Sequence, residues 1–359
     1  MFDAAHASAS PGLLAIFLDW AKAFDRIKHD ILIEALGRFG IPERMVEFIA
    51  GIYAERYFIL KDGGGDSTRR RQRAGIAQGC PLSPYLFIIV QSVMFFDIDS
   101  KMRDRGDNIE EPPYVVCSDL LYADDTMLAS SNTEKLQALL DYVIGEGARY
   151  GLELNWGKTV GIGIHHNGVV SDPSGTPVRM VDKVVYLGGL LTSDMSAKPE
   201  LSRRIGEAKA IFKALHKCWA HANITRGRKI ELYKAIVVPK LMYNLESIWL
   251  LQADKRKLDG FHARCLRKIL SIPSSFVSRI SNKTVLERSG ETPLSTTLSE
   301  RQTALYCKIA ALPEDNFLRM LTCDPHSSEP RRWDLRRKRG RPKQQWSACV
   351  HNQCDDHWF

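Results

Sequence analysis

The stretch LLYADDTMLA, residues 120–129, decides the fold of this chain. Two adjacent acids, Asp124 and Asp125, stand between two apolar segments, where the core of a strand normally excludes charge. The pattern predicts a tight hairpin with both acids at its turn. For an isolated Asp-Asp pair, turn preference alone is a sufficient explanation, because Asp tolerates turn conformations well. The sequence around the pair has to decide between a plain turn and a functional site.

Upstream, another acid follows an apolar run. Residues 13–18, LLAIFL, form a continuous apolar stretch that predicts a buried strand ending at Asp19. Helical patterns follow at residues 28–39, which Gly40 closes, and from residue 42 to about 53. The first acid and the Asp pair therefore both stand at ends of expected strands.

Between the two acidic positions the sequence predicts a hairpin and a long helix. Residues 56–60 and 68–73 form the two arms of the hairpin, and the second arm is strongly basic. A solvated edge is the alternative interpretation of those charges. The run at residues 85–96 is long enough for a buried helix, and residues 136–150 form a further amphipathic helix.

Beyond about residue 195 the pattern becomes helical. Apolar residues recur every three or four positions from Leu201 to Trp219, as on one packed face of a helix. Further helices are expected at residues 228–250, kinked by Pro239, and at residues 255–269. These patterns predict a mostly helical second domain.

Composition sets broad limits on the class of protein. The 359 residues are enough for two or three domains, and 44% hydrophobic with 26% charged residues is ordinary for a globular chain. No apolar run reaches the length of a membrane span, and no cationic leader precedes the first apolar run. Eight scattered cysteines do not form the dense framework of small secreted proteins. We expect free thiols, no membrane anchor and an intracellular location, in the nucleus and cytoplasm.

The net charge of +8 is concentrated in one segment. Residues 331–343 contain eight Lys or Arg and one Asp, so this arm alone carries +7. The arm predicts a phosphate contact or a nuclear import signal, and a solvated tail is the alternative. Bulk charge therefore says little about the rest of the chain.

The chemistry that suits separated aspartates at strand ends is phosphoryl transfer to a nucleotide. That reaction uses two divalent ions held by carboxylates, which neutralise charge on the attacking and leaving oxygens. Magnesium prefers oxygen ligands and keeps waters and phosphates in its shell, so two or three aspartates suffice. Asp19, Asp124 and Asp125 form the one candidate set.

Three ordered motifs resemble those of reverse transcriptases. Tyr122-Ala123-Asp124-Asp125 matches the YADD box, FLDWAKAFDRIKH at residues 17–29 looks like motif A, and GIAQGCPLSPYLF at residues 75–87 looks like motif B. LELNWGKTVGI at residues 152–162 resembles motif D, and YLGGLLT at residues 186–192 resembles motif E, the primer grip. The phrases ELYKAIVVPKLMYNLE and KRGRPKQQW are similar to those of non-LTR (LINE-type) retrotransposons.

The resemblance implies an α+β fold, a right-hand polymerase palm with an antiparallel sheet and helices, followed by a mostly helical thumb. We expect the palm at residues 1–195, the thumb at 196–275, and a helical or linker region with the basic arm at 276–359. Almost nothing precedes motif A, so the fingers region of the family is expected to be largely missing. Oligomeric state is left open.

For the metal site, the resemblance implies that Asp19, Asp124 and Asp125 bind two Mg²⁺ ions, with Mn²⁺ as a substitute. The implied partners are an RNA template, a DNA primer or target, and deoxynucleoside triphosphates. The implied substrate contacts are Phe24, Gln78, Gly79, Tyr122 and Lys158, and the implied primer grip is Leu187, Gly188 and Gly189.

Individual roles follow from the same resemblance. Phe24 matches the ring under the incoming sugar, which would exclude a 2′ hydroxyl, and core packing is its alternative. Gln78 and Gly79 match the motif B pair near nucleotide and template, and Lys158 matches the proton donor to pyrophosphate, with a plain solvated charge as the alternative. Asp25 is expected to cap the following helix rather than to bind metal.

Two other functions compete with reverse transcription. A catalytically silent nucleic-acid-binding remnant would keep the thumb and basic arm without turnover, and the intact aspartate triad weighs against it. An RNA-directed RNA polymerase shares the metal chemistry, but it normally carries a different acid box and a small or polar residue at the sugar gate. Tyr122-Ala123 and Phe24 disfavour that second alternative.

Overall fold

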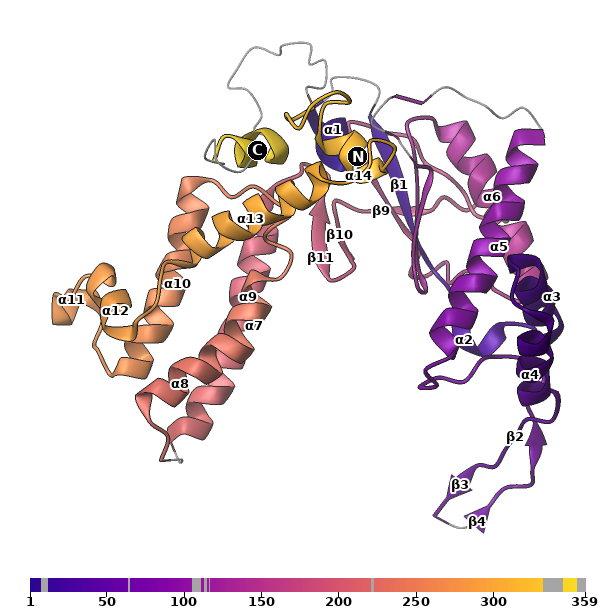
Figure 1. The fold of residues 1–359 in the computed structure, drawn as a ribbon, viewed down its shortest axis with the longest axis horizontal. Coiled ribbons are helices and arrows are strands. Elements are labelled where there is room, and N and C mark those ends of the chain that lie inside the picture. The colour runs from indigo at the N-terminus through magenta and orange to yellow at the C-terminus, as the bar shows by residue number, and fades with distance from the viewer. Residues whose placement is uncertain are drawn as a thin grey trace. The chain divides into compact units, whose positions relative to one another are not determined.

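Two compact units make up the chain in the computed structural model (Figure 1). The structure describes residues 1–7, 12–63, 65–104, 111–112, 115, 117–220, 223–331 and 345–353. The sheet unit is Pro11–Val181, and the helical unit combines Met1–Ser10 with Asp182–Phe359. Each unit is described by itself below.

A five-stranded sheet organises the sheet unit. Its order is β6-β7-β1-β8-β9, and every pairing is antiparallel except the parallel pair β8–β9. The central strand is β1, whose apolar residues are buried, as a continuous apolar run predicts. The strands are β1 (Leu13–Asp19), β6 (Asp119–Tyr122), β7 (Asp125–Ser130), β8 (Val160–Ile164) and β9 (Arg179–Met180).

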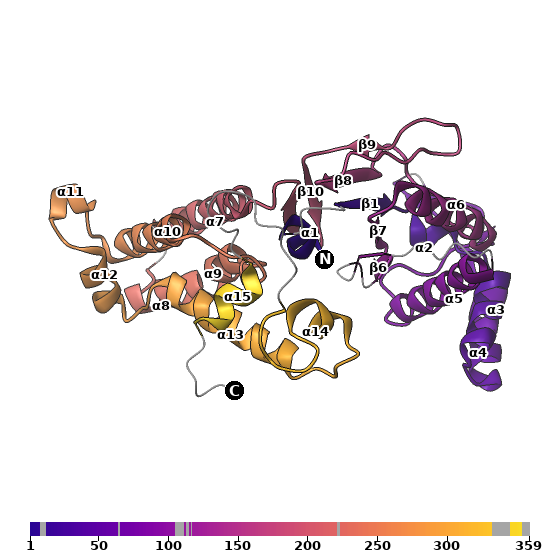
Figure 2. The ribbon, with the colours of Figure 1, turned by 90° about the horizontal axis from the view of Figure 1, so that it is seen from above.

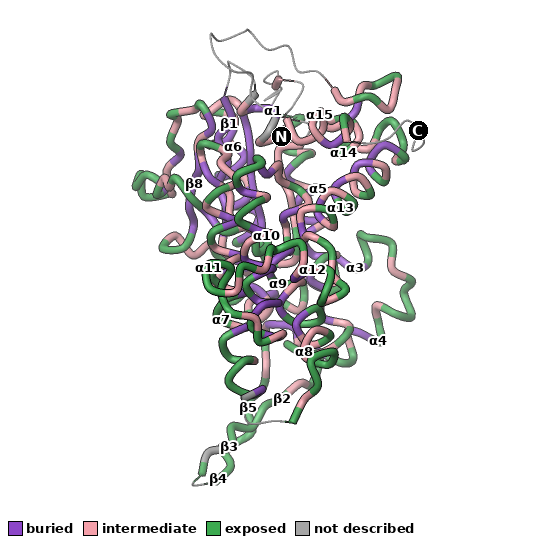
Figure 3. The backbone as a smooth tube through the Cα atoms, turned by 90° about the vertical axis from the view of Figure 1, so that its left-hand side faces the viewer, coloured by how far each residue is buried: buried purple, intermediate pink, exposed green. Residues whose placement is uncertain are grey.

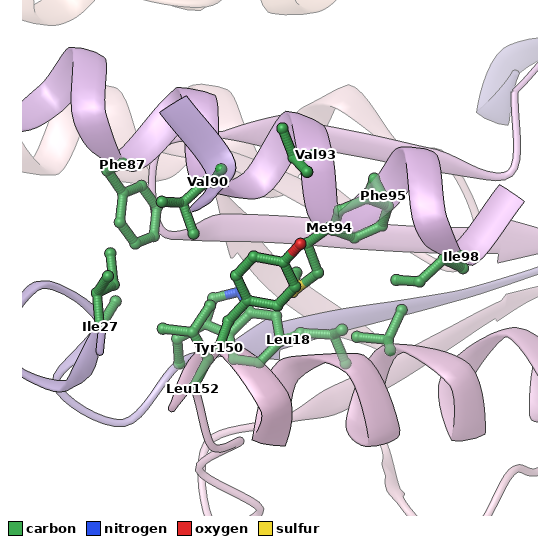
Figure 4. Close-up of a cluster of buried hydrophobic side chains, with 14 of the residues drawn as sticks. Leu18, Ile27, Phe87, Val90, Val93, Met94, Phe95, Ile98, Tyr150 and Leu152 are labelled. Atoms are coloured by element: carbon green, nitrogen blue, oxygen red, sulfur yellow. The ribbon is translucent and has the colours of Figure 1, made fainter. Parts of the chain in front are cut away.

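Helices cover one side of this sheet, as the view in Figure 2 shows for α5 and α6. Helix α6 begins after Asn132, whose side chain accepts from the Lys135 amide, and ends at Gly151 with φ of 87°. Figure 4 shows Val90 and Met94 gathered with Leu18 of β1 and Tyr150. The helices are α2 (Ala23–Arg26), α3 (His29–Phe39), α4 (Glu43–Ala54), α5 (Ser83–Asp104) and α6 (Thr133–Tyr150).

A two-stranded ribbon follows α4 and confirms the predicted hairpin. At the base of the ribbon, next to α4, β2 pairs with β5, and nearer the tip β3 pairs with β4. Figure 3 draws the ribbon as a mostly exposed extension of the sheet unit. The four short strands are β2 (Tyr57–Phe58), β3 (Lys61–Asp62), β4 (Gly65–Asp66) and β5 (Arg70–Arg71).

The helical unit contains one hairpin, formed by β10 (Lys183–Tyr186) and β11 (Gly189–Thr192), and a bundle of helices. Buried residues of its longer helices share one apolar core that includes Phe212, Tyr233 and Leu266. The helices are α1 (Phe2–Ala7), α7 (Ala197–Ala220), α8 (Arg226–Leu232), η1 (Tyr233–Val237), α9 (Val238–Met242), α10 (Gln252–Leu270), α11 (Ser275–Ser278), α12 (Asn282–Ser289), α13 (Leu294–Ala310), α14 (Phe317–Thr322) and α15 (Trp346–His351).

The expected helix at 228–250 is wrong over its last eight residues, 243–250. It ends at Met242, because Tyr243 has ψ of 130° and Asn244 has φ of 64°. Pro239 occupies the first turn of α9, and the π-helical turn η1 directly precedes that helix. Proline has no N–H to donate within a helix, and here the helix type changes locally just before it.

The predicted class is confirmed: a mostly antiparallel sheet with helices is followed by a largely helical part, as in an α+β palm and thumb. No helix among the described residues has the length and apolarity to cross a bilayer. The seven cysteines within the described residues are free thiols, as expected. Most of the basic arm at 331–343 lies outside the described residues.

Candidate active site

The first and third candidate aspartates face each other across two strands. Asp19 is the last residue of β1, and its partner in the register with β7 is Asp125. Asp125 also pairs with Tyr122 on β6, so Ala123 and Asp124 form the two-residue loop of the β6–β7 hairpin. Ala123 has φ of 52°, a left-handed conformation that costs a non-glycine residue about 1 kcal/mol or more. The predicted hairpin is therefore confirmed, with backbone strain at its turn.

Negative charge accumulates at this sheet end. Burial, then the Asp124 carboxylate and then the Asp19 carboxylate raise the pKa of Asp125 above its ordinary value. In the part of the chain that the structure describes, no three His, Cys, Asp or Glu side chains converge closely enough to hold a metal ion. The site is therefore a strained anionic cluster rather than a finished metal cage.

One cation already lies beside the aspartates. The Lys158 ammonium is 3.4 Å from both carboxylate oxygens of Asp19. The Asn155 amide donates to the Asp19 carbonyl at 2.7 Å, and the Lys158 amide donates to the Asn155 carbonyl at 3.0 Å. These backbone bonds fix the turn that carries Lys158 to the end of β1. The side chain of Lys158 is 68% exposed, so its ammonium remains open to a further partner.

Phe24 packs against the core and is also partly exposed. Its ring stacks on Phe87 of α5, with centroids 4.8 Å apart and planes inclined by 14°. The Ile76 amide donates to the Phe24 carbonyl at 2.7 Å, which ties the motif B loop to this residue. Phe24 is half-buried, so one part of the ring packs on the core and the rest faces outward.

Gln78 is joined to Asp25, and this contact corrects one expectation. The Gln78 side-chain amide donates to the Asp25 carboxylate at 3.2 Å. Asp25 does not cap the following helix: the N-cap of α3 is Lys28, which makes no side-chain capping bond. Asp25 lies instead in the first turn of α2, where it is exposed toward the motif B loop. Motifs A and B are thus linked side chain to side chain.

Glycines shape the motif B loop in two different ways. Gly79 has φ of 82° and open space where a Cβ would stand, so it is exposed and available for a close approach. Gly75 has φ of 90°, and a Cβ there would lie 2.7 Å from the Asp25 carbonyl oxygen. Gly75 is a residue that the sequence analysis did not single out, although a glycine two positions after the basic second arm of the hairpin was a visible signal.

Tyr122 lies at the end of β6 with 66% of its surface exposed. It is the register partner of Asp125, so its backbone helps to place that carboxylate. The exposed ring fits the substrate contact that the motif implies.

The predicted primer grip belongs to the helical unit. Leu187 and Gly188 form the two-residue turn of the β10–β11 hairpin, with φ of 47° and 73°. Two positive φ values identify a type I′ turn, which favours glycine or asparagine at the position that Leu187 occupies. A Cβ on Gly189 would lie 2.1 Å from the Asn244 side-chain nitrogen, so that side chain would have to move to admit it.

Three donors hold this turn, and none of them was foreseen. Arg203 donates to the Gly188 carbonyl at 2.6 Å, Arg204 donates to the same oxygen, and the Tyr243 hydroxyl donates to the Leu187 carbonyl at 2.9 Å. Arg204 also lies 4.6 Å from the centre of the Tyr243 ring. Glu200 pairs with both arginines and accepts from the Leu190 amide. We call these four side chains the turn clamp.

Comparison with known proteins gives the site its context. A family model described as "Reverse transcriptase (RNA-dependent DNA polymerase)" matches residues 4–189. A Pol polyprotein from the type-1 retrotransposable element R2 of Popillia japonica is 30% identical over 74% of this chain and 38% of that protein. The RNA-directed DNA polymerase from the mobile element jockey of Drosophila melanogaster is 26% identical over 72% of this chain and 28% of that protein.

The chain thus spans well under half the length of these curated relatives. Among solved structures, apo telomerase from Candida tropicalis is 14% identical with a TM-score of 0.43, over 87% of this chain and 48% of that chain. The family match covers just over half of the chain and contains the aspartates, the motif B loop and Lys158. By that match and by its R2 and jockey relatives, this chain belongs to the reverse transcriptase family, on the branch of the non-LTR retrotransposons.

Proposed function

We propose that this chain carries out RNA-directed DNA synthesis, in which a primer 3′ hydroxyl attacks the α-phosphate of a deoxynucleoside triphosphate. The observation that carries the proposal is the pairing of Asp19 with Asp125 at one end of the sheet, beside the Asp124 turn. The proposed partners are an RNA template and a DNA primer.

Asp19, Asp124 and Asp125 are the residues that would hold the two divalent ions. Their carboxylate oxygens are the hard donors that Mg²⁺ prefers, and Mn²⁺ accepts the same set. The raised pKa of Asp125 supports the fit, because crowded carboxylates gain from a cation between them. Lys158 already provides one positive charge at Asp19. When bound, Mg²⁺ supplies neutralisation of charge at the attacking and leaving oxygens.

The other residues position the substrate. Asp25 accepts from Gln78, which orients that amide and the loop that carries Gly79. Phe24, supported from behind by Phe87, offers a rigid ring to the incoming sugar and would collide with a 2′ hydroxyl. Lys158 has an exposed ammonium that can give a proton to the leaving pyrophosphate oxygen. Orientation and preorganised charge are the main sources of rate enhancement in this reaction class.

The test is primer extension on an RNA template with deoxynucleotides and Mg²⁺. We compare the chain with Asp124→Asn and with Asp141→Asn, an exposed acid on α6 that serves as the control. Extension by the chain and the control, with loss of at least about a hundredfold in Asp124→Asn, supports the proposal. No extension by the unaltered chain, with RNA binding retained, favours the silent nucleic-acid-binding alternative instead.

A further inference from the structure

The ribbon between α4 and the motif B loop has a distinct chemical character. Its first arm is aromatic and apolar, with exposed Tyr57 and Phe58 followed by Ile59 and Leu60. Its second arm is basic. The register pairs Tyr57 with Arg71 and Phe58 with Arg70, so each aromatic residue lies opposite an arginine.

Four arginines of this ribbon have no acidic partner among the described residues. Arg69, Arg70, Arg71 and Arg73 are exposed, and none forms an ion pair with any carboxylate among the described residues. Three other arginines of the sheet unit do pair with carboxylates: Arg26 with Glu153, Arg38 with Asp97, and Arg149 with Glu34. Between residues 56 and 73 the sequence holds six Lys or Arg and two Asp. This positive charge is available to an anionic partner.

The aromatic side chains of the ribbon, Tyr57 and Phe58, are exposed to solvent. Phe58 is 43% exposed and Tyr57 is 40% exposed. Arg69 lies 4.0 Å from the centre of the Tyr57 ring, a cation–π contact that holds both groups near the surface. Alternation along a strand sends Tyr57 and Phe58 to opposite faces of the ribbon. Each face therefore offers one ring and neighbouring guanidinium groups.

Hydrogen bonds fasten the base of the ribbon to the candidate active site. The Gln72 amide donates to the Arg56 carbonyl at 2.8 Å, and the Gln72 side chain donates to the carbonyls of Ala74 and Gly75. The Gly75 amide then donates to the Ile27 carbonyl at 2.8 Å. The second arm of the ribbon thus runs directly into the motif B loop, and these hydrogen bonds join the two.

We propose that this ribbon binds single-stranded template RNA, with the arginines on phosphates and Tyr57 and Phe58 stacked on bases. A basic surface interleaved with exposed rings is the pattern that holds unpaired strands, because rings can stack only on bases that are free of a duplex. The inference rests on the proposed polymerase function for the identity of the strand as template. The two faces of the ribbon can contact successive nucleotides on the way to the motif B loop.

The experiment measures RNA binding by fluorescence anisotropy, without metal or nucleotides, at several salt concentrations. The test variant is Arg69→Gln/Arg70→Gln/Arg73→Gln, which leaves the Arg71 bond to the Ala54 carbonyl intact. The matched control is Arg44→Gln/Arg103→Gln/Arg179→Gln, which removes three exposed arginines elsewhere in the sheet unit that form no ion pair with a described carboxylate. Thermal melting verifies that each variant is folded.

We expect the test variant to bind a single-stranded RNA 30-mer at least tenfold more weakly, and its slope of log affinity against log salt to fall by about 2 to 3. Phe58→Ala should cost about tenfold, more than Leu60→Ala on the same arm, because stacking on a base requires a ring. The control should change both quantities much less.

Unchanged affinity and salt slope in the folded test variant would overturn the proposal, as would an equal loss in the control. Equal losses on single-stranded RNA and on duplex RNA, with no effect of Phe58→Ala, would overturn the assignment to an unpaired strand. Binding of a DNA 30-mer of the same sequence is measured as well. If the ribbon variants weaken binding of DNA only, the assignment to a template RNA is contradicted. A chain that binds RNA through the ribbon but extends no primer fails the polymerase test alone, so the two failures are distinguishable.

Discussion

Asp19 and Asp125 are direct partners across the antiparallel strands β1 and β7. Because burial and neighbouring carboxylates raise the pKa of Asp125, its ionisation opposes folding above the ordinary Asp pKa. We expect Asp125→Asn to increase the free energy of unfolding at pH 7 by less than about 1 kcal/mol, since solvent screens a partly exposed group. The gain should vanish below about pH 4, where the carboxyl is protonated in both states.

The same variant should lose a response to Mg²⁺. An ion that binds only the folded state raises the melting temperature, so Mg²⁺ should stabilise the unaltered chain and not Asp125→Asn. Asp119→Asn is the control, because burial and Asp99 raise the pKa of Asp119 in a comparable way. Its stability should also rise while its Mg²⁺ response persists. A Mg²⁺ response retained in Asp125→Asn would contradict the metal assignment.

Phe24 should decide the choice of sugar. We expect Phe24→Val to raise incorporation of ribonucleotides relative to deoxynucleotides about tenfold or more, because a smaller side chain leaves space for a 2′ hydroxyl. The variant also loses its stacking on Phe87, at a cost of about 1 to 3 kcal/mol. Phe87→Leu separates the two effects: it should lower stability similarly but change sugar selection much less, because the Phe24 ring itself remains. Parallel changes in both variants would show that Phe24 acts only in packing.

Gly75 should tolerate no side chain. Gly75→Ala places a Cβ against the Asp25 backbone at positive φ, so we expect destabilisation by about 2 to 3 kcal/mol in urea unfolding. Gly37→Ala on α3 is the matched control, since no atom lies within 4 Å of its new Cβ. There the better helix propensity of alanine should stabilise by about 0.5 to 1 kcal/mol. Equal effects at the two positions would show that the clash at Gly75 is relieved by a shift of the loop.

The turn clamp should contribute more to the free energy of unfolding than exposed ion pairs of the same unit do. Arg204 and Glu200 are 2% and 1% exposed, so Arg204→Ala leaves a buried carboxylate short of a partner and should cost about 2 to 4 kcal/mol. Tyr243→Phe should cost about 1 kcal/mol and speed hydrogen exchange of the peptide that spans 183–192. Arg228→Ala removes an exposed pair with Glu231 and should cost under about 0.5 kcal/mol. If hydrogen exchange of this peptide is unchanged in Tyr243→Phe, the Tyr243 hydroxyl does not stabilise the β10–β11 turn.

His262 should make the helical unit sensitive to mild acid. Burial lowers its pKa, although the charges of Glu291 and Asp259 act the other way, and its ring accepts or donates at 2.8 Å to the Tyr233 hydroxyl. The unfolded state therefore takes up a proton first, so stability is full above about pH 6.5 and falls below it, by up to about 1.4 kcal/mol per pH unit. His262→Gln should flatten this slope in denaturant titrations, and exposed His216→Gln should keep it.

Much of the fold could be predicted because local pattern and burial agree. The apolar run of β1, the capped amphipathic helix α6 and the β6–β7 hairpin all follow from periodicity and turn chemistry. The end of α9 could not be predicted, because it depends on the left-handed backbone conformation of Asn244, which the local sequence does not require. The prediction that Asp25 caps the following helix was wrong, because its carboxylate instead accepts from Gln78, which lies 53 positions away in the sequence.

In the candidate site too, features set by local sequence could be predicted and those set by tertiary packing could not. The aspartates are recognisable from local motifs, since each stands where a strand ends. The Phe24–Phe87 stack, the Lys158–Asp19 contact and the turn clamp depend on side chains brought together by tertiary packing. Their substrate roles stay predictions until the variants above are measured.

The turn clamp also bears on how this sequence can drift over generations. The strained turn at Leu187 and Gly188 depends on donors that stand 15, 16 and 56 positions further along the chain. A mutation at either arginine removes one of the two donors to the Gly188 carbonyl. A side chain on Gly188, which has φ of 73°, would lie 3.3 Å from the Tyr243 ring. Neither place can change alone at low cost, so in copies of this element the hairpin tip and helix α7 should be inherited, and lost, together.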